Sequence, residues 1–138
     1  MPLNTALIDK VTSSPRKVFF IDAIGAVVSA LSLYVLVLPL NEYFGVPEQI
    51  IIILGSVSAM FIGFSGLCMH FARNHDVIKL KIIIMGNLFY GVLTAVLIAR
   101  NLTEVTGLGI AYFVAEYSVI IALVMLEREC LKKLKASK

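Results

Sequence analysis

Four long apolar runs constrain this chain more than any other feature of its sequence. They cover residues 18–40, 50–71, 82–99 and 105–126. About 20 consecutive apolar residues carry a helix across the ~30 Å hydrocarbon core of a bilayer, so each run is close to the required length. Because lipid offers backbone N–H and C=O groups no other partner, such a span must be helical. The sequence therefore predicts an all-α integral membrane protein, in which one four-helix transmembrane bundle occupies residues 1–138.

The composition excludes other classes of protein. Hydrophobic residues make up 59% of the chain and charged residues 15%, against roughly 25% charged residues in a soluble domain. The net charge is +3, but the basic residues flank the apolar runs instead of forming a stripe, so we expect no nucleic-acid partner. Cys68 and Cys130 lack C-x-x-C spacing, which argues against a zinc site, and no cofactor motif is recognised. We therefore expect neither a metal nor a cofactor.

Positive charge is distributed unevenly along the chain. Eleven of the 12 Lys and Arg residues lie before the first run, between the second and third, or after the fourth. Only Arg100 lies on the other side, so the positive-inside rule places both termini and the middle loop in the cytoplasm. The basic tail, residues 127–138, should also attract anionic lipid, at about 1 kcal/mol per basic residue. The eleven residues are Lys10, Arg16, Lys17, Arg73, Lys79, Lys81, Arg128, Lys132, Lys133, Lys135 and Lys138.

The N-terminal segment is expected to lie on the membrane surface. Leu3, Leu7 and Val11 repeat every four residues, which is typical of a short interfacial helix with one apolar face. The first apolar run is expected to be a retained span and not a cleaved signal peptide. Its 23 residues are too many for such a peptide, and no A-x-A cleavage site follows.

Two carboxyl groups lie inside the predicted spans, where each costs about 2.5–3.5 kcal/mol at a helix centre. From the helical rise per residue, Asp22 lies roughly 6 Å and Glu116 about 15 Å from the cytoplasmic edge. Asn87 and Tyr90 lie at about 7–8 Å and 12 Å, and Tyr112 lies one turn beyond Glu116. This ladder predicts a polar vestibule that opens to the cytoplasm and ends at a protonatable Glu116. All five are candidate ligand-binding or proton-binding residues.

Each of these residues also has an interpretation that needs no function. Asp22 could cap a helix or reach the interface, and Asn87 could join two helices by a hydrogen bond. Tyr90 and Tyr112 could be packing residues whose hydroxyls have found partners. Glu116 could be a neutral acid bonded to Asn87 or Tyr90.

Small residues predict where the helices approach one another closely. They are Ala26 and Ala30 in line with Asp22, Gly91 in line with Asn87, and Gly55, Ala59 and Gly63 on the second span. The last of these stripes is the candidate seam for a homo-oligomer. Four helices of this length enclose little space, so a solute path would need a second subunit.

Three segments resemble those of small four-helix membrane proteins of bacteria. They are DAIGA at residues 22–26, NLFY at 87–90 and GIAYFVAE at 109–116. The resemblance implies a four-helix fold in the bacterial inner (cytoplasmic) membrane, and it implies no established activity.

Three functions stay open on this basis. The first is a small transporter or ligand-binding bundle that uses Glu116, with Asp22, as a proton or cation site. The second is an intramembrane enzyme acting on a hydrophobic small molecule or lipid, with Glu116 as acid or base, although the sequence offers no nucleophile. The third is an accessory or assembly subunit whose polar residues specify helix contacts. A pocket at Glu116 would favour the first two, and a dry, sealed Glu116 would favour the third.

Overall fold

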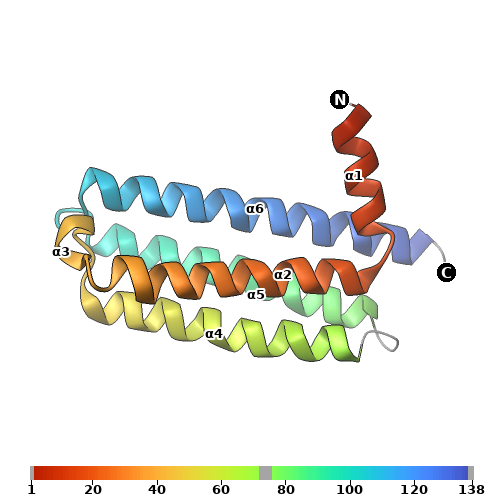
Figure 1. Ribbon diagram of the computed structural model, residues 1–138, viewed down its shortest axis with the longest axis horizontal. Helices are drawn as coiled ribbons and strands as arrows, with labels where there is room; N and C mark the ends of the chain where they lie inside the picture. The colour runs from red at the N-terminus through yellow and green to blue at the C-terminus, as the bar shows by residue number, and fades with distance from the viewer. Residues whose placement is uncertain (1, 72–75, 137–138) are drawn as a thin grey trace.

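The computed structural model describes residues 2–71 and 76–136, with side chains described from residue 6 onward. Within these residues the chain is helical and contains no β-strand (Figure 1). Its elements are α1 (Pro2–Thr12), α2 (Pro15–Leu31), the π-helical η1 (Ser32–Val37), α3 (Asn41–Phe44), α4 (Glu48–His70), α5 (Asp76–Arg100) and α6 (Gly107–Ala136). Of the residues used above, Arg73, Lys138 and the side chain of Leu3 lie outside this description.

Four helices are long and apolar enough to cross a membrane. The first combines α2 with η1, which continues it without a break, and the other three are α4, α5 and α6. They contain 23 to 30 residues, and the most apolar stretch of each has a mean hydropathy of 2.0 to 2.2. The predicted all-α class with four membrane-length helices is therefore confirmed, and these helices suggest an integral membrane protein.

The last helix extends beyond its apolar run. The sequence predicts that this span ends at residue 126 and that residues 127–138 form a basic tail, whereas α6 continues to Ala136. Glu127 and Cys130 are buried at helical spacing, while Arg128 and Lys132 are exposed. This amphipathic pattern is typical of a helix that packs one face against the bundle, so the helix continues past residue 126. Basic side chains in the last turn also interact favourably with the negative end of the helix dipole.

The four long helices lie side by side (Figure 1). α2 packs most extensively against α4, and α5 packs most extensively against α6, while α2 also contacts α6. The short α3 lies at one end of the bundle, here called the α3 end. α1 projects from the opposite end, here called the α1 end, where the C-terminus also lies (Figure 1).

Two loops meet backbone to backbone at the α3 end. Gly45 has a φ of 67°, and a Cβ atom there would lie 2.0 Å from the carbonyl oxygen of Glu104. Thr106 donates from its backbone N–H to the carbonyl of Phe44 at 3.1 Å and from its hydroxyl to the carbonyl of Tyr43 at 2.6 Å. Only glycine combines this left-handed backbone with so close an approach. This contact fixes the position of α6 relative to α2 and α4 at that end.

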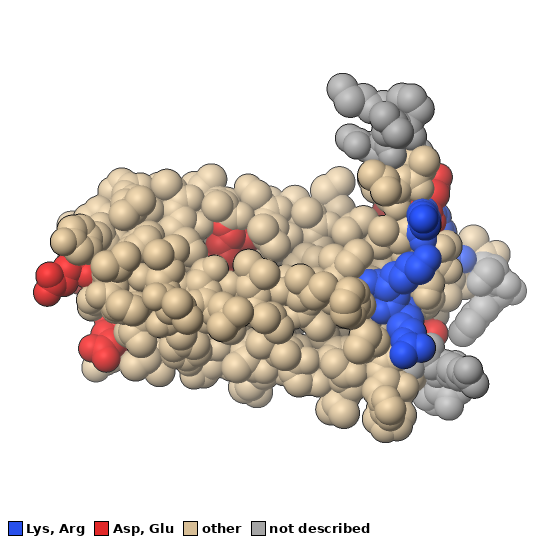
Figure 2. All heavy atoms as spheres, in the orientation of Figure 1, with Lys and Arg blue, Asp and Glu red and all other residues tan. Residues whose placement is uncertain are grey.

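An apolar cluster closes the α1 end. Its buried members are Val18, Phe19, Cys68, Leu80, Ile83 and Cys130. α1 lies across the end of α6, where the Nζ atom of Lys133 is 2.9 Å from Asp9 Oδ1 and 2.6 Å from Thr12 Oγ1. On the visible face, Lys and Arg side chains gather at this end and acidic side chains reach the surface at the α3 end (Figure 2). The basic side chains visible in this view are thus confined to the α1 end.

Candidate functional site

Two groups of polar side chains are buried inside the bundle, at different distances from its ends. The central cluster consists of Ser29 on α2, Tyr90 on α5 and Glu116 on α6. The acid pair consists of Asp22 on α2 and Glu127 on α6, with Ser65 on α4 and Asn87 on α5 as its donors. The acid pair lies nearer the α1 end, because Asp22 precedes Ser29 by two helical turns and Glu127 follows Glu116 by three.

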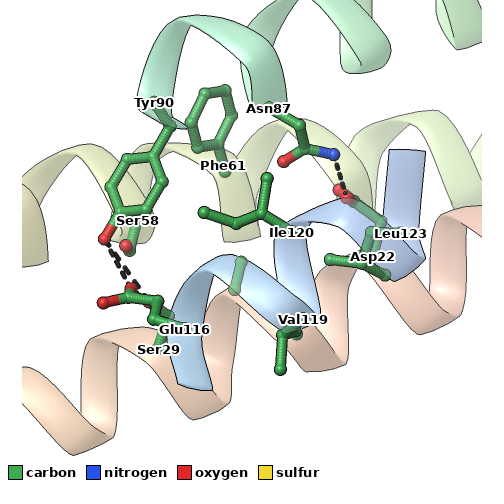
Figure 3. Close-up of a pocket in the computed structure, with 12 residues that line it drawn as sticks. Asp22, Ser29, Ser58, Phe61, Asn87, Tyr90, Glu116, Val119, Ile120 and Leu123 are labelled. Atoms are coloured by element: carbon green, nitrogen blue, oxygen red, sulfur yellow. Dashed lines mark hydrogen bonds between the residues drawn. The ribbon is translucent and has the colours of Figure 1, made fainter. Parts of the chain in front are cut away.

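The central cluster directs two hydroxyl groups at one oxygen of Glu116. The hydroxyl of Tyr90 donates to Glu116 Oε1 at 2.8 Å, and the hydroxyl of Ser29 donates to the same atom (Figure 3). Ser58 faces the Tyr90 hydroxyl from α4. The other oxygen, Glu116 Oε2, is buried and has no hydrogen-bond partner among the described residues. A carboxyl with one satisfied and one free oxygen can still accept a proton or a ligand.

Tyr112 connects this cluster to the α3 end. It lies one turn from Glu116 on α6, with its hydroxyl near the carboxyl of Glu116 and near Ser32. Its ring contacts Phe44 edge-on with a centroid distance of 5.9 Å and Phe113 at 5.0 Å. Tyr112 thus joins the central cluster to the apolar core of the α3 end, which also contains aliphatic side chains such as Leu33 and Val37.

A cavity of about 40 Å³ runs between the two polar groups. Asp22 and Asn87 line one end of it, Glu116 and Tyr90 line the other, and Phe61 and Ile120 lie between them (Figure 3). A buried water needs about 10–15 Å³ of such space and two to four polar partners. The cavity is therefore large enough for two or three waters, with polar partners at both ends.

A wider recess of about 160 Å³ reaches Glu116 from the side, between α2 and α6. Its wall is apolar apart from Glu116, Tyr112 and two serines, and Val119 lines both the recess and the cavity. The space-filling view shows acidic atoms at the surface midway along the apolar bundle, between α2 and α6 (Figure 2). Glu116 itself is 8% exposed. The structure thus connects a nearly buried carboxyl with an apolar side opening.

The acid pair is more completely enclosed. Asn87 Nδ2 donates to Asp22 Oδ1 at 2.9 Å and to Glu127 Oε1 at 2.8 Å, so one amide group serves both carboxyls. Ser65 donates to the other oxygen of Asp22, and the two carboxyls lie within hydrogen-bond reach of each other. Asp22 is 3% exposed and Glu127 is 0% exposed. Glu127 Oε2 has no hydrogen-bond donor among the described residues.

The predicted site residues are therefore divided between two places. The structure brings Asp22 together with Asn87, and Tyr90 together with Glu116. Asn87 does not bond to Glu116, because both hydrogens of its amide are directed at the acid pair. The single ladder of the sequence analysis is thus two groups joined by a cavity.

Sequence reasoning missed Glu127 and the serines. Glu127 directly follows the last apolar run, and the next two residues, Arg128 and Glu129, are charged, so it resembled part of the basic tail. The signal that could have found it is its position in the stripe of Leu123, Glu127 and Cys130, all buried. Ser29 and Ser65 carry no such signal, since serine is common in membrane helices and its hydroxyl can also bond to its own backbone.

The predicted small-residue stripes take different positions. Ala30 and Gly91 are buried between helices, Ala26 lines the cavity, and the Gly91 carbonyl accepts from Tyr117. Gly55 is covered by the ring of Tyr34, which η1 places against α4. Ala59 and Gly63 are exposed, and among the described residues no atom beyond the local backbone of α4 and the two chain neighbours lies within 4 Å of a Cβ built on Gly63. Within one chain, only Gly55 of that stripe packs against another helix.

The residues of both groups present carboxyl, hydroxyl and amide groups. Among residues 2–71 and 76–136, no three His, Cys, Asp or Glu side chains converge as metal ligands. Compared with models of protein families, with curated proteins and with solved structures, the chain finds no match. The resemblance of the three short segments therefore stays a prediction, and the function is inferred from the geometry of the site.

Proposed function

We propose that this protein is a proton-linked ligand-binding bundle of the kind that a small membrane transporter uses, with Glu116 as its binding carboxyl. The observation that carries the proposal is that Glu116 lines both the cavity and the side recess, while its Oε2 atom accepts no hydrogen bond from the described residues. A carboxyl that served only to join helices would have both oxygens satisfied and no space beside it. An acid at such depth is costly, which makes a functional role the default interpretation.

The chemistry of the recess favours a small hydrophobic ligand with a cationic group. Its wall is apolar, including Val28 and Val119, and its polar end is the Glu116 carboxyl with the ring of Tyr112 beside it. A carboxylate attracts a cation, and an aromatic ring attracts it further when water is excluded. Because the recess opens between α2 and α6, the ligand would enter from the side of the bundle.

Binding of such a ligand should be linked to release of a proton. An ionised carboxyl without a counter-cation is unfavourable inside the bundle, so the empty site is expected to hold the proton on Glu116. A permanent cation that binds beside Glu116 replaces that proton. Alternate occupation by proton and cation is the elementary step of proton-coupled transport.

The test uses benzyltrimethylammonium, whose charge does not depend on pH. Titration calorimetry of the purified protein in two buffers of different ionisation enthalpy counts the protons released per ligand bound. We expect about one proton per cation, because one carboxyl is exchanged. Benzyl alcohol, a neutral molecule of similar size, should bind more weakly and release none.

Glu116→Gln should abolish both binding and proton release while keeping the fold, since glutamine preserves the shape of the side chain. Glu129→Gln is the matched control, because Glu129 lies on the same helix and pairs with Lys132 at the surface. An assembly role predicts the opposite: Glu116→Gln would be silent, and Glu116→Leu would leave the bundle as stable or more so. Unchanged binding in Glu116→Gln would overturn the proposal.

We further propose that both termini lie in the cytoplasm of a bacterial cell and that the bundle spans the inner membrane. The segregation of Lys and Arg to the α1 end supports this orientation. The exposed Leu7 and Ile8 support contact of α1 with the membrane surface, where the basic end of α6 would meet anionic lipid. Cysteines at 43 or 103 should react with an impermeant thiol reagent outside intact cells, and one at 135 only after lysis. Labelling at 135 from outside would contradict this orientation.

We also propose a homo-oligomer in which α4 contributes to the contact. Support comes from Ala59 and Gly63, two small residues one helical turn apart on α4 that are both exposed in the described part of the chain. Ala59→Trp should shift the protein to a smaller species in light scattering from detergent solution. A wild-type monomer, or an Ala59→Trp oligomer of unchanged mass, would contradict the proposed seam.

A further inference from the structure

We propose that Asp22 and Glu127 form a second proton-binding site, which holds one proton between its two carboxyls and exchanges it with Glu116 through the cavity. The existence of the site depends only on the geometry of the acid pair. Its exchange with Glu116 rests on the proposed function, in which Glu116 gains and loses a proton.

The contacts of the acid pair require a proton. Its two carboxyls lie within hydrogen-bond reach of each other, and both accept from the same amide. Two carboxylates at such a distance cannot both ionise, because like charges in a buried site strongly disfavour the doubly ionised form. Glu127 Oε2 is buried, on a side chain that is 0% exposed, and lacks a donor. A proton on one of the two carboxyls supplies the missing hydrogen bond.

The donors around the pair favour a proton over a metal cation. The Nδ2 group of Asn87 directs its hydrogens at both carboxyls, and the hydroxyl of Ser65 points at Asp22. These hydrogens occupy the positions from which the carboxyl oxygens would coordinate a cation. They stabilise the single negative charge that remains when two carboxyls share one proton. The arrangement resembles the two-carboxylate dyads that titrate as a unit.

The other titratable groups near the pair are neutral thiols or are already paired. Cys68 on α4 and Cys130 on α6 belong to the apolar cluster on the side of the α1 end. At that end, Lys79 forms an ion pair with Asp76 at 3.9 Å, and Lys133 forms one with Asp9 at 2.9 Å. Among the described residues, no Lys, Arg or His forms an ion pair with Asp22 or Glu127. Within residues 2–71 and 76–136 the pair therefore has no counter-cation, and we infer that a proton limits its charge.

Among the described residues, the cavity gives the proton a route toward the centre of the bundle. Toward the α1 end the pair is covered by the apolar cluster that includes Phe19 and Leu80. Toward the centre of the bundle, Asp22 and Asn87 line the cavity whose other end is formed by Tyr90 and Glu116 (Figure 3). The distance along α2 from Asp22 to Ser29 is about 10 Å, which two or three waters can bridge. The transfer breaks and forms O–H bonds only, from a carboxyl to water and from water to the Glu116 carboxylate.

The first test detects the shared proton without any ligand. Infrared spectra of Glu116→Gln protein should show the C=O stretch of a protonated carboxyl, because the pair keeps its proton in that background. Isotopic labelling of either aspartate or glutamate carboxyls with ¹³C should move this band, since the proton belongs to both groups. This measurement needs no further substitution and so does not depend on whether an altered pair folds.

Substitutions then assign this infrared band to Asp22 and Glu127. Adding Asp22→Asn or Glu127→Gln to Glu116→Gln should remove it, because the remaining carboxyl ionises beside its donors. Glu129→Gln, in the same background, should leave it unchanged. A spectrum without the band, or a band that moves with only one of the two labels, would overturn the shared site even if Glu116 binds the cation as proposed.

The second test measures exchange between the sites. After transfer into D₂O, the carboxyl band of the acid pair should shift in frequency as its proton is replaced by deuterium, which reaches the pair by way of Glu116 and the cavity. Glu116→Gln should slow this shift by about a hundredfold, the lower end of what a positioned proton donor contributes, and Glu129→Gln should not. An unchanged rate would overturn the exchange through the cavity. This readout uses no ligand, so a failure of cation binding would be seen separately, by calorimetry.

Discussion

The central cluster and the acid pair use the same chemistry in two different environments. In both, hydroxyl or amide donors from neighbouring helices hold a carboxyl inside the bundle. Glu116 keeps one free oxygen beside an opening, whereas Asp22 and Glu127 face each other behind an apolar cluster. The comparison indicates that the two groups differ in the space beside their carboxyls and not in the type of acid. Glu116 lies beside an opening that admits a ligand, whereas the enclosed acid pair has room only for a proton.

The largest expected loss of stability follows from removing Asn87, the hydrogen-bond donor that Asp22 and Glu127 share. Asn87→Leu removes both hydrogen bonds of one amide and leaves two buried carboxyls facing each other. It should lower the free energy of unfolding by about 3–5 kcal/mol, since each hydrogen bond to an ionisable group contributes about 1.5–3 kcal/mol. Denaturant titration in mixed micelles, followed by circular dichroism, measures the loss.

Asn101→Leu is the matched control for this change. Asn101 donates at 2.8 Å to the carbonyl of Leu97 at the end of α5, away from any carboxyl. Its loss should cost about 1 kcal/mol, as for an ordinary hydrogen bond. Equal losses for the two variants would mean that the hydrogen bonds of Asn87 to the acid pair stabilise the fold no more than an ordinary hydrogen bond does.

A hydrophobic carbodiimide should separate the two groups by reactivity. Dicyclohexylcarbodiimide modifies protonated carboxyls that it can reach from an apolar phase, and only Glu116 borders the recess between α2 and α6. Mass spectrometry of digested protein should show Glu116 modified about a hundredfold faster than Glu127, a difference of about 2.8 kcal/mol. Comparable modification of Glu127 would show that the acid pair is not enclosed.

The serines provide a smaller and more direct comparison. Ser65→Ala removes a donor from Asp22 at a position with 0% exposure, where water cannot replace it, and should cost about 1–3 kcal/mol in unfolding free energy. Ser29→Ala leaves Tyr90 on Glu116 and opens onto the cavity, so it should cost only about 0.5–1.5 kcal/mol. Ser118→Ala, at an exposed position on α6, serves as the reference. The reverse order of losses would contradict the difference in access.

The smallest expected effect is on the rate at which the carbodiimide reaches Glu116 through the recess between α2 and α6. Val119→Trp adds a large ring where the recess meets the cavity, and it should slow carbodiimide modification of Glu116 about tenfold, or about 1.4 kcal/mol. Val114→Trp places the same ring on an exposed part of α6 outside the recess and should not slow it. If both variants react at the wild-type rate, the reagent reaches Glu116 by another route.

The sequence was sufficient to predict the class of fold because apolar length is a property of each segment alone. The pairing of Asp22 with Asn87 and of Tyr90 with Glu116 was also within reach, since a constant helical rise converts position into depth. Depth does not determine rotation, however. The division of these residues into two groups depends on how α5 and α6 turn toward α2, which only packing decides. Glu127 was missed because an amphipathic helix end and a polar tail have similar composition.

The burial of both native cysteines has a practical consequence. Cys68 on α4 and Cys130 on α6 are 5% and 0% exposed and lie in the same apolar cluster. A thiol reagent can reach them only when that end of the bundle opens, so their modification rate in the wild-type chain measures the frequency of local unfolding. The two native thiols therefore report how often the apolar cluster between the acid pair and the α1 end opens. This measurement needs no engineered reporter and no change to any carboxyl.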